Sequence, residues 1–329
     1  MIGKIEYIQN VTSELTFSNY LDHFIARIGI KRDKHLVPPG LYKIGNPSSD
    51  SNVFVTANYT LSFDALRSSL KGIDGYILVL DTKGINVWCA AGKGTFGTDE
   101  LVKKIKESEL EKIVDHRKII LPQLGGPGVA AHEVKNQTGF RVLYGPVLAK
   151  DLPEYLKNNK ATPEMRSVNF RLKDRLILIP VEIVGMLLPL ILIGTILYFT
   201  LGILPSLAFS SSILAGVVLF PILLPWLPTP NFSTKGFILG GIVAIIFGIL
   251  NIVINNYSSL VFLTLTTLVV LLVIPSVTAF LSLNFTGATT FTSKSGVKKE
   301  IYTFFPKMVW MFAGGIIFFI GSILYKILI

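Results

Sequence analysis

The fold is decided by the stretch YILVLDTKGINVWCAAGK, residues 76–93. Its first five residues form a continuous apolar run of the length of one buried strand. The small residues Ala90, Ala91 and Gly92 come soon after, directly behind Cys89. Because α/β sheets bind ligands at the carboxyl ends of their strands, this stretch predicts both a strand and a ligand site.

The neighbouring sequence repeats this alternation of short β-rich runs and helix-length amphipathic segments. Such a rhythm predicts a doubly wound, Rossmann-like α/β domain. Residues 1–50 carry no motif that can be interpreted. The expected elements are strands at 53–56, 76–80, 118–121 and 141–144 and helices near 63–70, 98–105, 129–137 and 151–159.

Charge and apolar residues divide the chain into two unlike parts. Of 31 Lys and Arg residues, 25 lie at or before Arg175, as do 19 of 21 Asp and Glu residues. The remainder is long enough for about five membrane-spanning helices of about 20 residues each; four or six spans are alternatives. We therefore predict a soluble domain over 1–165, a basic linker over 166–175 and a transmembrane domain over 176–329. The expected spans are 176–201, 206–227, 236–254, 260–282 and 306–329.

The basic residues beside these spans predict the orientation in the membrane. With the soluble domain in the cytoplasm, nine of them lie on the inner side, whereas only Lys326 lies outside. No cleavable signal peptide is expected, and nucleic acid is not an expected partner. Glu182, inside the first span, is either a functional carboxylate or one that reaches the interface. The inner residues are Arg166, Arg171, Lys173, Arg175, Lys235, Lys294, Lys298, Lys299 and Lys307.

Cys89 is the single cysteine of the chain, which excludes a disulfide within the chain, a Cys-x-x-Cys metal site and a cysteine-bound iron-sulfur cluster. A lone cysteine is often a buried small hydrophobe. Here, however, Lys93 follows four residues later and favours the thiolate. The small residues next to Cys89 would let a planar macrocycle approach the sulfur.

Other motifs are weak or absent. Residues 92–97 match Gly-x-Gly-x-x-Gly, but the acidic residue that a dinucleotide site requires is missing from its expected place. The sequence holds neither a phosphate loop nor a Gly-x-Ser-x-Gly elbow. No metal-ligand spacing relates His23, His35, His116 and His132, so we expect each to be a surface residue or to form a local hydrogen bond.

The run from Asn86 to Thr98 resembles the signature of the corrinoid protein of the microbial mercury-methylation pair. The wider stretch of about 50–160, including 55–59, 80–84 and 128–133, is similar to the corrinoid domain in the large subunit of the corrinoid iron-sulfur protein of the acetyl-coenzyme A pathway. That second protein is soluble and carries its own cluster. A soluble domain followed by about five spans fits the first family.

The resemblance implies a cobalamin-type corrinoid whose cobalt takes Cys89 as lower axial ligand. As a soft, strong donor, the thiolate would favour departure of the methyl group bound opposite. Corrin contacts are implied for the cap-helix residues and, by position, for loops at other strand ends. The implied cofactor residues are Asn86, Val87, Trp88, Cys89, Ala90, Ala91, Gly92, Lys93, Thr56, Asn58, Tyr59, Thr60, Gly125, Gly126 and Gly128.

The function implied is that of a membrane-anchored, corrinoid-dependent methyltransferase that converts mercury(II) to methylmercury at the cytoplasmic membrane. The implied partners are a ferredoxin-like iron-sulfur electron donor, a methyl-donor protein or methylated folate, and membrane lipid. One alternative is a corrinoid methyl carrier of one-carbon metabolism with another acceptor. A transporter or sensor with a nucleotide-binding domain is the other.

Overall fold

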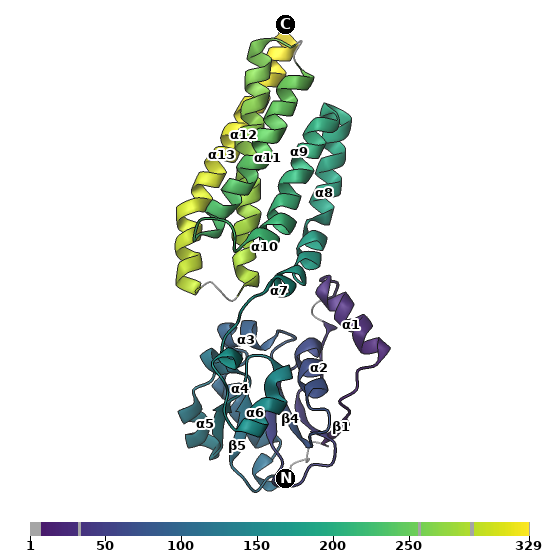
Figure 1. Ribbon diagram of the computed structural model, residues 1–329, viewed down its shortest axis with the longest axis vertical. Helices are drawn as coiled ribbons and strands as arrows, with labels where there is room; N and C mark the ends of the chain where they lie inside the picture. The colour runs from purple at the N-terminus through teal and green to yellow at the C-terminus, as the bar shows by residue number, and fades with distance from the viewer. Residues whose placement is uncertain (1–7, 32–33, 256–257, 290–292, 329) are drawn as a thin grey trace. The chain divides into compact units, whose positions relative to one another are not determined.

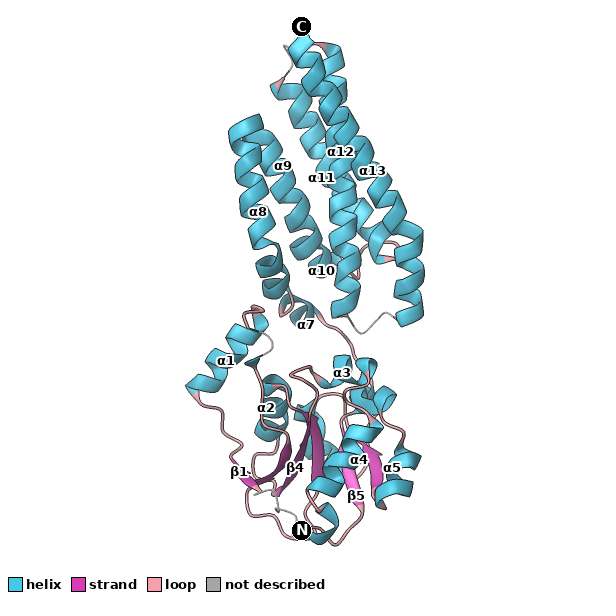
Figure 2. Cartoon of the chain, turned by 180° about the vertical axis from the view of Figure 1, so that it is seen from behind, coloured by secondary structure: helices cyan, strands magenta, loops and turns pink. Residues whose placement is uncertain are grey.

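The computed structural model describes residues 8–31, 34–255, 258–289 and 293–328. The first seven residues of the predicted soluble domain and residue 329, the end of the last predicted span, lie outside the described residues. The chain forms two compact units that divide between Asn169 and Phe170 (Figure 1). The first contains a sheet flanked by helices, and the second contains only helices among its described residues (Figure 2).

One sheet of six strands is formed by the described part of the first unit, in the order β1-β2-β4-β3-β5-β6. The strands β4, β3, β5 and β6 are parallel, whereas β2 pairs antiparallel with β4. The chain leaves β3 for β4 on one side and returns to β5 on the other, which places a topological switch point between β3 and β5. The strands are β1 (Gln9–Val11), β2 (Gly40–Ile44), β3 (Val53–Ala57), β4 (Gly75–Leu80), β5 (Lys118–Leu121) and β6 (Arg141–Tyr144).

Helices cover both faces of this sheet, as the doubly wound prediction requires. On one face Val55, Leu78 and Leu80 pack with Phe96 and Leu101 in a buried core. On the other, residues such as Phe54 and Ile77 pack against α2 and α6. The helices are α1 (Phe17–Arg27), α2 (Thr60–Ser69), α3 (Val87–Lys93), α4 (Thr98–Glu107), η2 (Leu110–Lys112), η3 (Gln123–Gly128), α5 (Ala131–Thr138), η4 (Ala149–Asp151), α6 (Leu152–Asn158) and η5 (Glu164–Arg166).

Within its described residues, the second unit contains five helical segments long and apolar enough to cross a membrane. Their number agrees with the sequence prediction. The last segment begins at Ser295 rather than near 306, because the helix continues beyond its apolar part into a basic turn with Lys298 and Lys299. The helices are α7 (Leu172–Leu176), α8 (Ile179–Leu201), α9 (Ile203–Leu214), η6 (Ala215–Leu219), α10 (Phe220–Leu223), α11 (Phe232–Ile254), α12 (Leu260–Asn284), η7 (Phe285–Ala288) and α13 (Lys294–Leu328).

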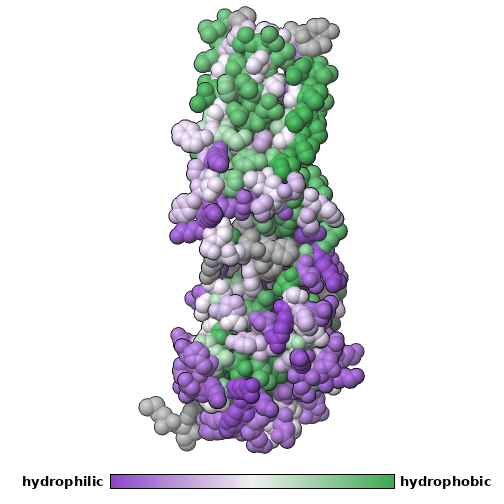
Figure 3. Space-filling view, turned by 60° about the vertical axis from the view of Figure 1, so that its left-hand side comes forward, coloured by the Kyte–Doolittle hydropathy of each residue, from purple (hydrophilic) through white to green (hydrophobic). Residues whose placement is uncertain are grey.

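Small residues let the central helices of this unit approach closely. A Cβ at Gly240 of α11 would lie 2.6 Å from the Pro275 Cα of α12, and one at Gly236 would lie 2.6 Å from the Ala279 Cα. Larger apolar side chains point outward, so the surface of this unit is hydrophobic (Figure 3). Such an arrangement is typical of helices that pack within lipid.

Candidate functional site

Cys89 lies in α3, a seven-residue helix that follows β4. The Asn86 side chain accepts a hydrogen bond of 2.9 Å from the Cys89 backbone N–H and so caps the helix. At the other end Gly94 adopts a left-handed conformation with φ of 85°. The N–H groups of Thr95 and Phe96 then donate to the Ala90 carbonyl. Both ends of this short helix are therefore fixed, and Cys89 with them.

The α3 helix contacts both β3 and η3, which follows β5, so it extends across the switch point. Ala90 and Ala91 are buried and belong to the core beneath the helix. Trp88, Cys89 and Gly92 remain half-buried, and Lys93 is exposed. The thiol therefore lies between core and surface at the carboxyl edge of the sheet, where α/β domains bind ligands.

Two glycines of η3 make room for α3 and the turn that follows it. A Cβ at Gly128 would lie 2.1 Å from the Phe96 carbonyl oxygen and 3.0 Å from the Ala91 Cα. One at Gly125 would lie 2.5 Å from the Phe96 ring, whereas one at Gly126 would meet nothing closer than the Tyr144 ring at 3.7 Å. Gly125 and Gly128 thus serve the close packing of η3 against this region; their contact with a cofactor stays a prediction.

The Tyr144 hydroxyl holds the end of η3 from the neighbouring strand. It donates a hydrogen bond of 2.8 Å to the Val129 carbonyl. Burial raises the pKa of Tyr144, which keeps the phenol protonated and able to donate. This bond joins the end of β6 to the chain that follows Gly128.

Asn58 joins the loops that follow β3 and β4. Its buried side-chain oxygen accepts hydrogen bonds from the Thr82 N–H at 3.0 Å, the Thr82 hydroxyl at 2.9 Å and the Gly84 N–H at 3.0 Å. Its side-chain N–H donates to Asp81. The predicted position of Asn58 at the strand end is correct, but its amide is engaged in fixing the loop that leads into α3. Direct contact with a corrin stays a prediction.

Two hydroxyls at this edge are buried without a hydrogen-bond partner among the described residues. They are Thr60 Oγ1, at the start of α2, and Thr95 Oγ1, in the turn after α3. A buried hydroxyl left unpaired costs about 1–3 kcal/mol. The pair therefore fits a ligand with polar groups along its edge. Thr95 was not among the predicted site residues, because only its position between Gly94 and Gly97 could have drawn attention to it.

The remaining predicted loop residues also lie at the end of β3. Thr56 is buried in the strand and Tyr59 is half-buried next to Asn58. The segment from His35 to Val37 pairs with this end: Leu36 forms a bridge with Tyr59, and the Thr60 N–H donates to the His35 carbonyl. A segment of the first 50 residues, which carry no motif, therefore pairs with the chain that follows β3.

Alternative chemistries find little support at this edge. The glycines of residues 92–97 lie between two helices, with Gly94 ending α3 and Gly97 preceding α4, rather than between a strand and its helix. Within the described residues there is no group of three His, Cys, Asp or Glu side chains that could hold a metal ion. His23, His35 and His116 form local hydrogen bonds, as predicted.

Taken together, these features define a doubly wound domain with a single thiol on a capped helix across its switch point. Residues 31–156 match the family model described as CO dehydrogenase/acetyl-CoA synthase delta subunit. The predicted similarity to a protein of the acetyl-coenzyme A pathway is thus confirmed for this stretch. A cobalamin-type corrinoid cofactor is consistent with this similarity. The similarity to the mercury-methylation protein stays a prediction.

Three curated relatives align with a segment of similar length, and each is an acetyl-CoA decarbonylase/synthase complex subunit gamma. The protein of Methanopyrus kandleri is 34% identical over 128 residues, 38% of this chain and 27% of that protein. The Archaeoglobus fulgidus protein is 34% identical over 125 residues, 37% of this chain and 26% of its own length. The Methanothermobacter thermautotrophicus protein is 35% identical over 127 residues, which are 38% of this chain and 27% of that protein. The chain thus spans about a quarter of the length of these relatives.

Proposed function

We propose that this chain is a membrane-anchored corrinoid protein that carries a methyl group and passes it to an acceptor. In this proposal the sheet domain would hold a cobalamin-type corrinoid at its switch point, and Cys89 Sγ would be the side chain that binds its cobalt. The observation that carries it is the half-buried thiol of Cys89 on a capped helix above small residues, within the stretch that matches the delta-subunit family.

The residues around Cys89 fit such a group. Ala90 and Ala91 pack into the core beneath the helix, so a ring bound over Cys89 would lie against the half-buried Trp88 and Gly92 instead. Thr60 and Thr95 would donate to amides on the ring edge, which would satisfy the two unpaired hydroxyls. When bound, the corrinoid would supply a cobalt centre that carries the methyl group, and the Cys89 thiolate would tune it as a ligand.

The acceptor best supported is one of one-carbon metabolism. The three relatives are named as subunits of a complex that makes or cleaves acetyl-CoA. On this basis the chain would exchange methyl groups with a methyl-donor protein or a methylated folate. An electron donor of the ferredoxin-like iron-sulfur type would restore the cofactor after oxidation, because the single cysteine of this chain excludes a cysteine-bound cluster of its own.

Mercury(II) is the second candidate acceptor, and one observation favours it. The five apolar helices lie outside residues 31–156, which match the delta-subunit family model. This layout of a Cys89 domain plus membrane helices is the one that the mercury-methylation resemblance implies. The product would be methylmercury, made on the cytoplasmic side of the membrane.

One assay separates the two acceptors. Full-length protein loaded with methylated corrinoid is incubated either with folate and acetyl-CoA-synthesis partners or with mercury(II) and a reduced ferredoxin-like donor. We expect methyl transfer to the first set; transfer to mercury(II) alone would instead select the second candidate. Cys89→Ala serves as the matched control, and activity that this variant retains in full would contradict the role of the thiol.

The membrane location rests on the five apolar segments and on the position of the basic residues. We propose that the sheet domain faces the cytoplasm, because the loops on its side of the membrane carry most of the positive charge. Protease added to intact right-side-out vesicles should leave the sheet domain uncut, and cleavage without lysis would contradict this orientation.

A further inference from the structure

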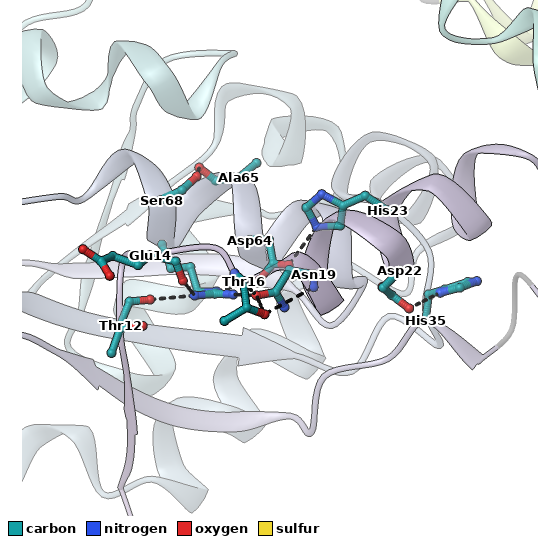
Figure 4. Close-up of polar contacts among 11 residues, drawn as sticks. Thr12, Glu14, Thr16, Asn19, Asp22, His23, His35, Asp64, Ala65 and Ser68 are labelled. Carbon is teal, nitrogen blue, oxygen red and sulfur yellow. Dashed lines mark hydrogen bonds and ion pairs between the residues drawn. The ribbon is translucent and has the colours of Figure 1, made fainter.

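The α1 helix turns its polar side toward the sheet domain. Asp64 of α2 is buried, and its carboxylate receives His23 Nε2 at 2.7 Å and Arg67 Nε at 2.6 Å (Figure 4). The residue of α1 before His23 is Asp22, and its Oδ1 lies 2.6 Å from His35 Nδ1. The side of α1 that a soluble helix would expose is therefore the side that faces the protein.

Arg67 fixes the start of α1 through further hydrogen bonds. Its guanidinium donates to the carbonyls of Thr12 and Glu14 at 2.7 Å each and to the Asn19 side chain at 3.1 Å. Thr16 and Asn19 in turn cap the first turn of the helix (Figure 4). Because these bonds engage buried charged groups, rotating α1 about its axis would leave them unpaired, which is costly.

The opposite side of α1 is apolar and exposed. Phe17, Tyr20, Leu21 and Phe24 follow the i, i+3, i+4, i+7 spacing of one helix face. Their exposed fractions are 83%, 59%, 48% and 60%. A contiguous stripe of this kind marks a surface that is covered in the working protein.

Charge and composition identify what covers this stripe. Its one Tyr is of a type favoured at the level of lipid head groups. Its two Phe residues and its Leu are typical of the apolar face of interfacial helices. Arg27, Lys31 and Lys34 follow it and are all exposed, which suits the anionic surface of a cytoplasmic leaflet. The stripe also lies outside residues 31–156, which match the delta-subunit family model, as do the five apolar helices.

We infer that α1 is an interfacial membrane helix, which lies on the cytoplasmic leaflet with Phe17, Tyr20, Leu21 and Phe24 immersed among the lipids. Such helices bury their apolar face about 5–10 Å into the boundary of head groups and acyl chains. The contact gives the sheet domain a second attachment to the bilayer besides the covalent one. This inference rests on the proposed membrane location but not on the cofactor or the acceptor.

Lipid contact can be measured on the full chain in nanodiscs that contain phosphatidylcholine and phosphatidylserine. Because Cys89 is the only cysteine, a Cys89→Ser background allows one environment-sensitive dye to be attached at Phe24→Cys or Tyr20→Cys. Lipids with brominated acyl chains should quench both dyes about twofold, while aqueous iodide should quench them weakly. A dye at Lys103→Cys, on the exposed side of α4, should be quenched strongly by aqueous iodide and weakly by the brominated lipids.

A dye at Ile245→Cys, on the exposed side of α11, reports separately on the membrane spans. Quenching by bromolipid at 245 but not at 20 or 24 would overturn the inference and leave the membrane location intact. A blue-shifted dye at 24 that neither quencher reaches would mean a protein partner instead, which also overturns it. No quenching by lipid at 245 would contradict the membrane location itself.

Hydrogen exchange of the unmodified protein provides an independent measurement. Residues 17–27 should exchange several-fold more slowly in the anionic nanodiscs than in nanodiscs of phosphatidylcholine alone, because Arg27, Lys31 and Lys34 add attraction. Equal rates in both, and in detergent, would contradict an interfacial helix.

Discussion

The sheet domain and the helical unit distribute their apolar side chains in opposite ways. In the sheet domain Leu78 and Leu80 are fully buried, whereas in the helical unit Leu188 and Phe199 are 74% and 79% exposed. Conversely, the polar residues Thr278 and Ser282 are fully buried between helices. The sheet domain buries its apolar side chains, as a protein surrounded by water does. The helical unit exposes them, which fits lipid as its surroundings. The α1 helix contacts the sheet domain, but it exposes apolar side chains as the helices of the helical unit do.

The largest expected effect comes from matched leucine truncations in the two regions. Leu78→Ala removes a side chain from the closed core and should lower the free energy of unfolding of the sheet domain by about 2–5 kcal/mol. Leu188→Ala, on an exposed surface, should change stability by no more than about 0.5 kcal/mol. Hydrogen exchange of β4 and of α8 in denaturant measures the stability of each region. Equal losses of stability in the two variants would contradict the difference between the regions.

The next effect tests how closely η3 packs against α3. Gly128→Ala places a Cβ against the backbone of Phe96 and Ala91, so we expect a loss of about 1–3 kcal/mol and weaker cobalt retention. Gly126→Ala is the matched control, since its Cβ meets only ordinary contacts. Thermal unfolding and cobalt content of both variants measure this. Equal stability and equal cobalt content in the two variants would contradict a role of Gly128 in close packing.

The smallest effect concerns packing between α11 and α12. Gly240→Ala should destabilise the helical unit by about 1 kcal/mol, because its Cβ would collide with Pro275 and Thr278. Gly241→Ala has nothing within 4 Å of the new Cβ and should instead stabilise the helix slightly, because alanine is the better helix former. Unfolding in detergent micelles compares them; the same sign for both would contradict the packing described here.

Sequence patterns predicted those features that depend on local order. The apolar run 76–80 predicted β4, and span-length apolar stretches predicted five helices, whereas the short helix that carries Cys89 was implied only by the family resemblance. What remained hidden depends on contacts distant in the chain. The amide of Asn58 binds groups 23 to 26 residues away. An amphipathic pattern in α1 shows that an apolar face exists, but only the contacts of Asp64 and Arg67 show that it points outward.

The central claim is that the Cys89 thiolate binds cobalt from below, and the visible spectrum with the cobalt content of full-length protein tests it most directly. Protein made with cobalamin supplied should be coloured, contain stoichiometric cobalt and show the spectrum of a sulfur-ligated corrinoid. Cys89→Ala should lose this spectral signature while the sheet domain stays folded. A colourless, cobalt-free wild-type protein, or an unchanged spectrum in Cys89→Ala, would contradict the claim.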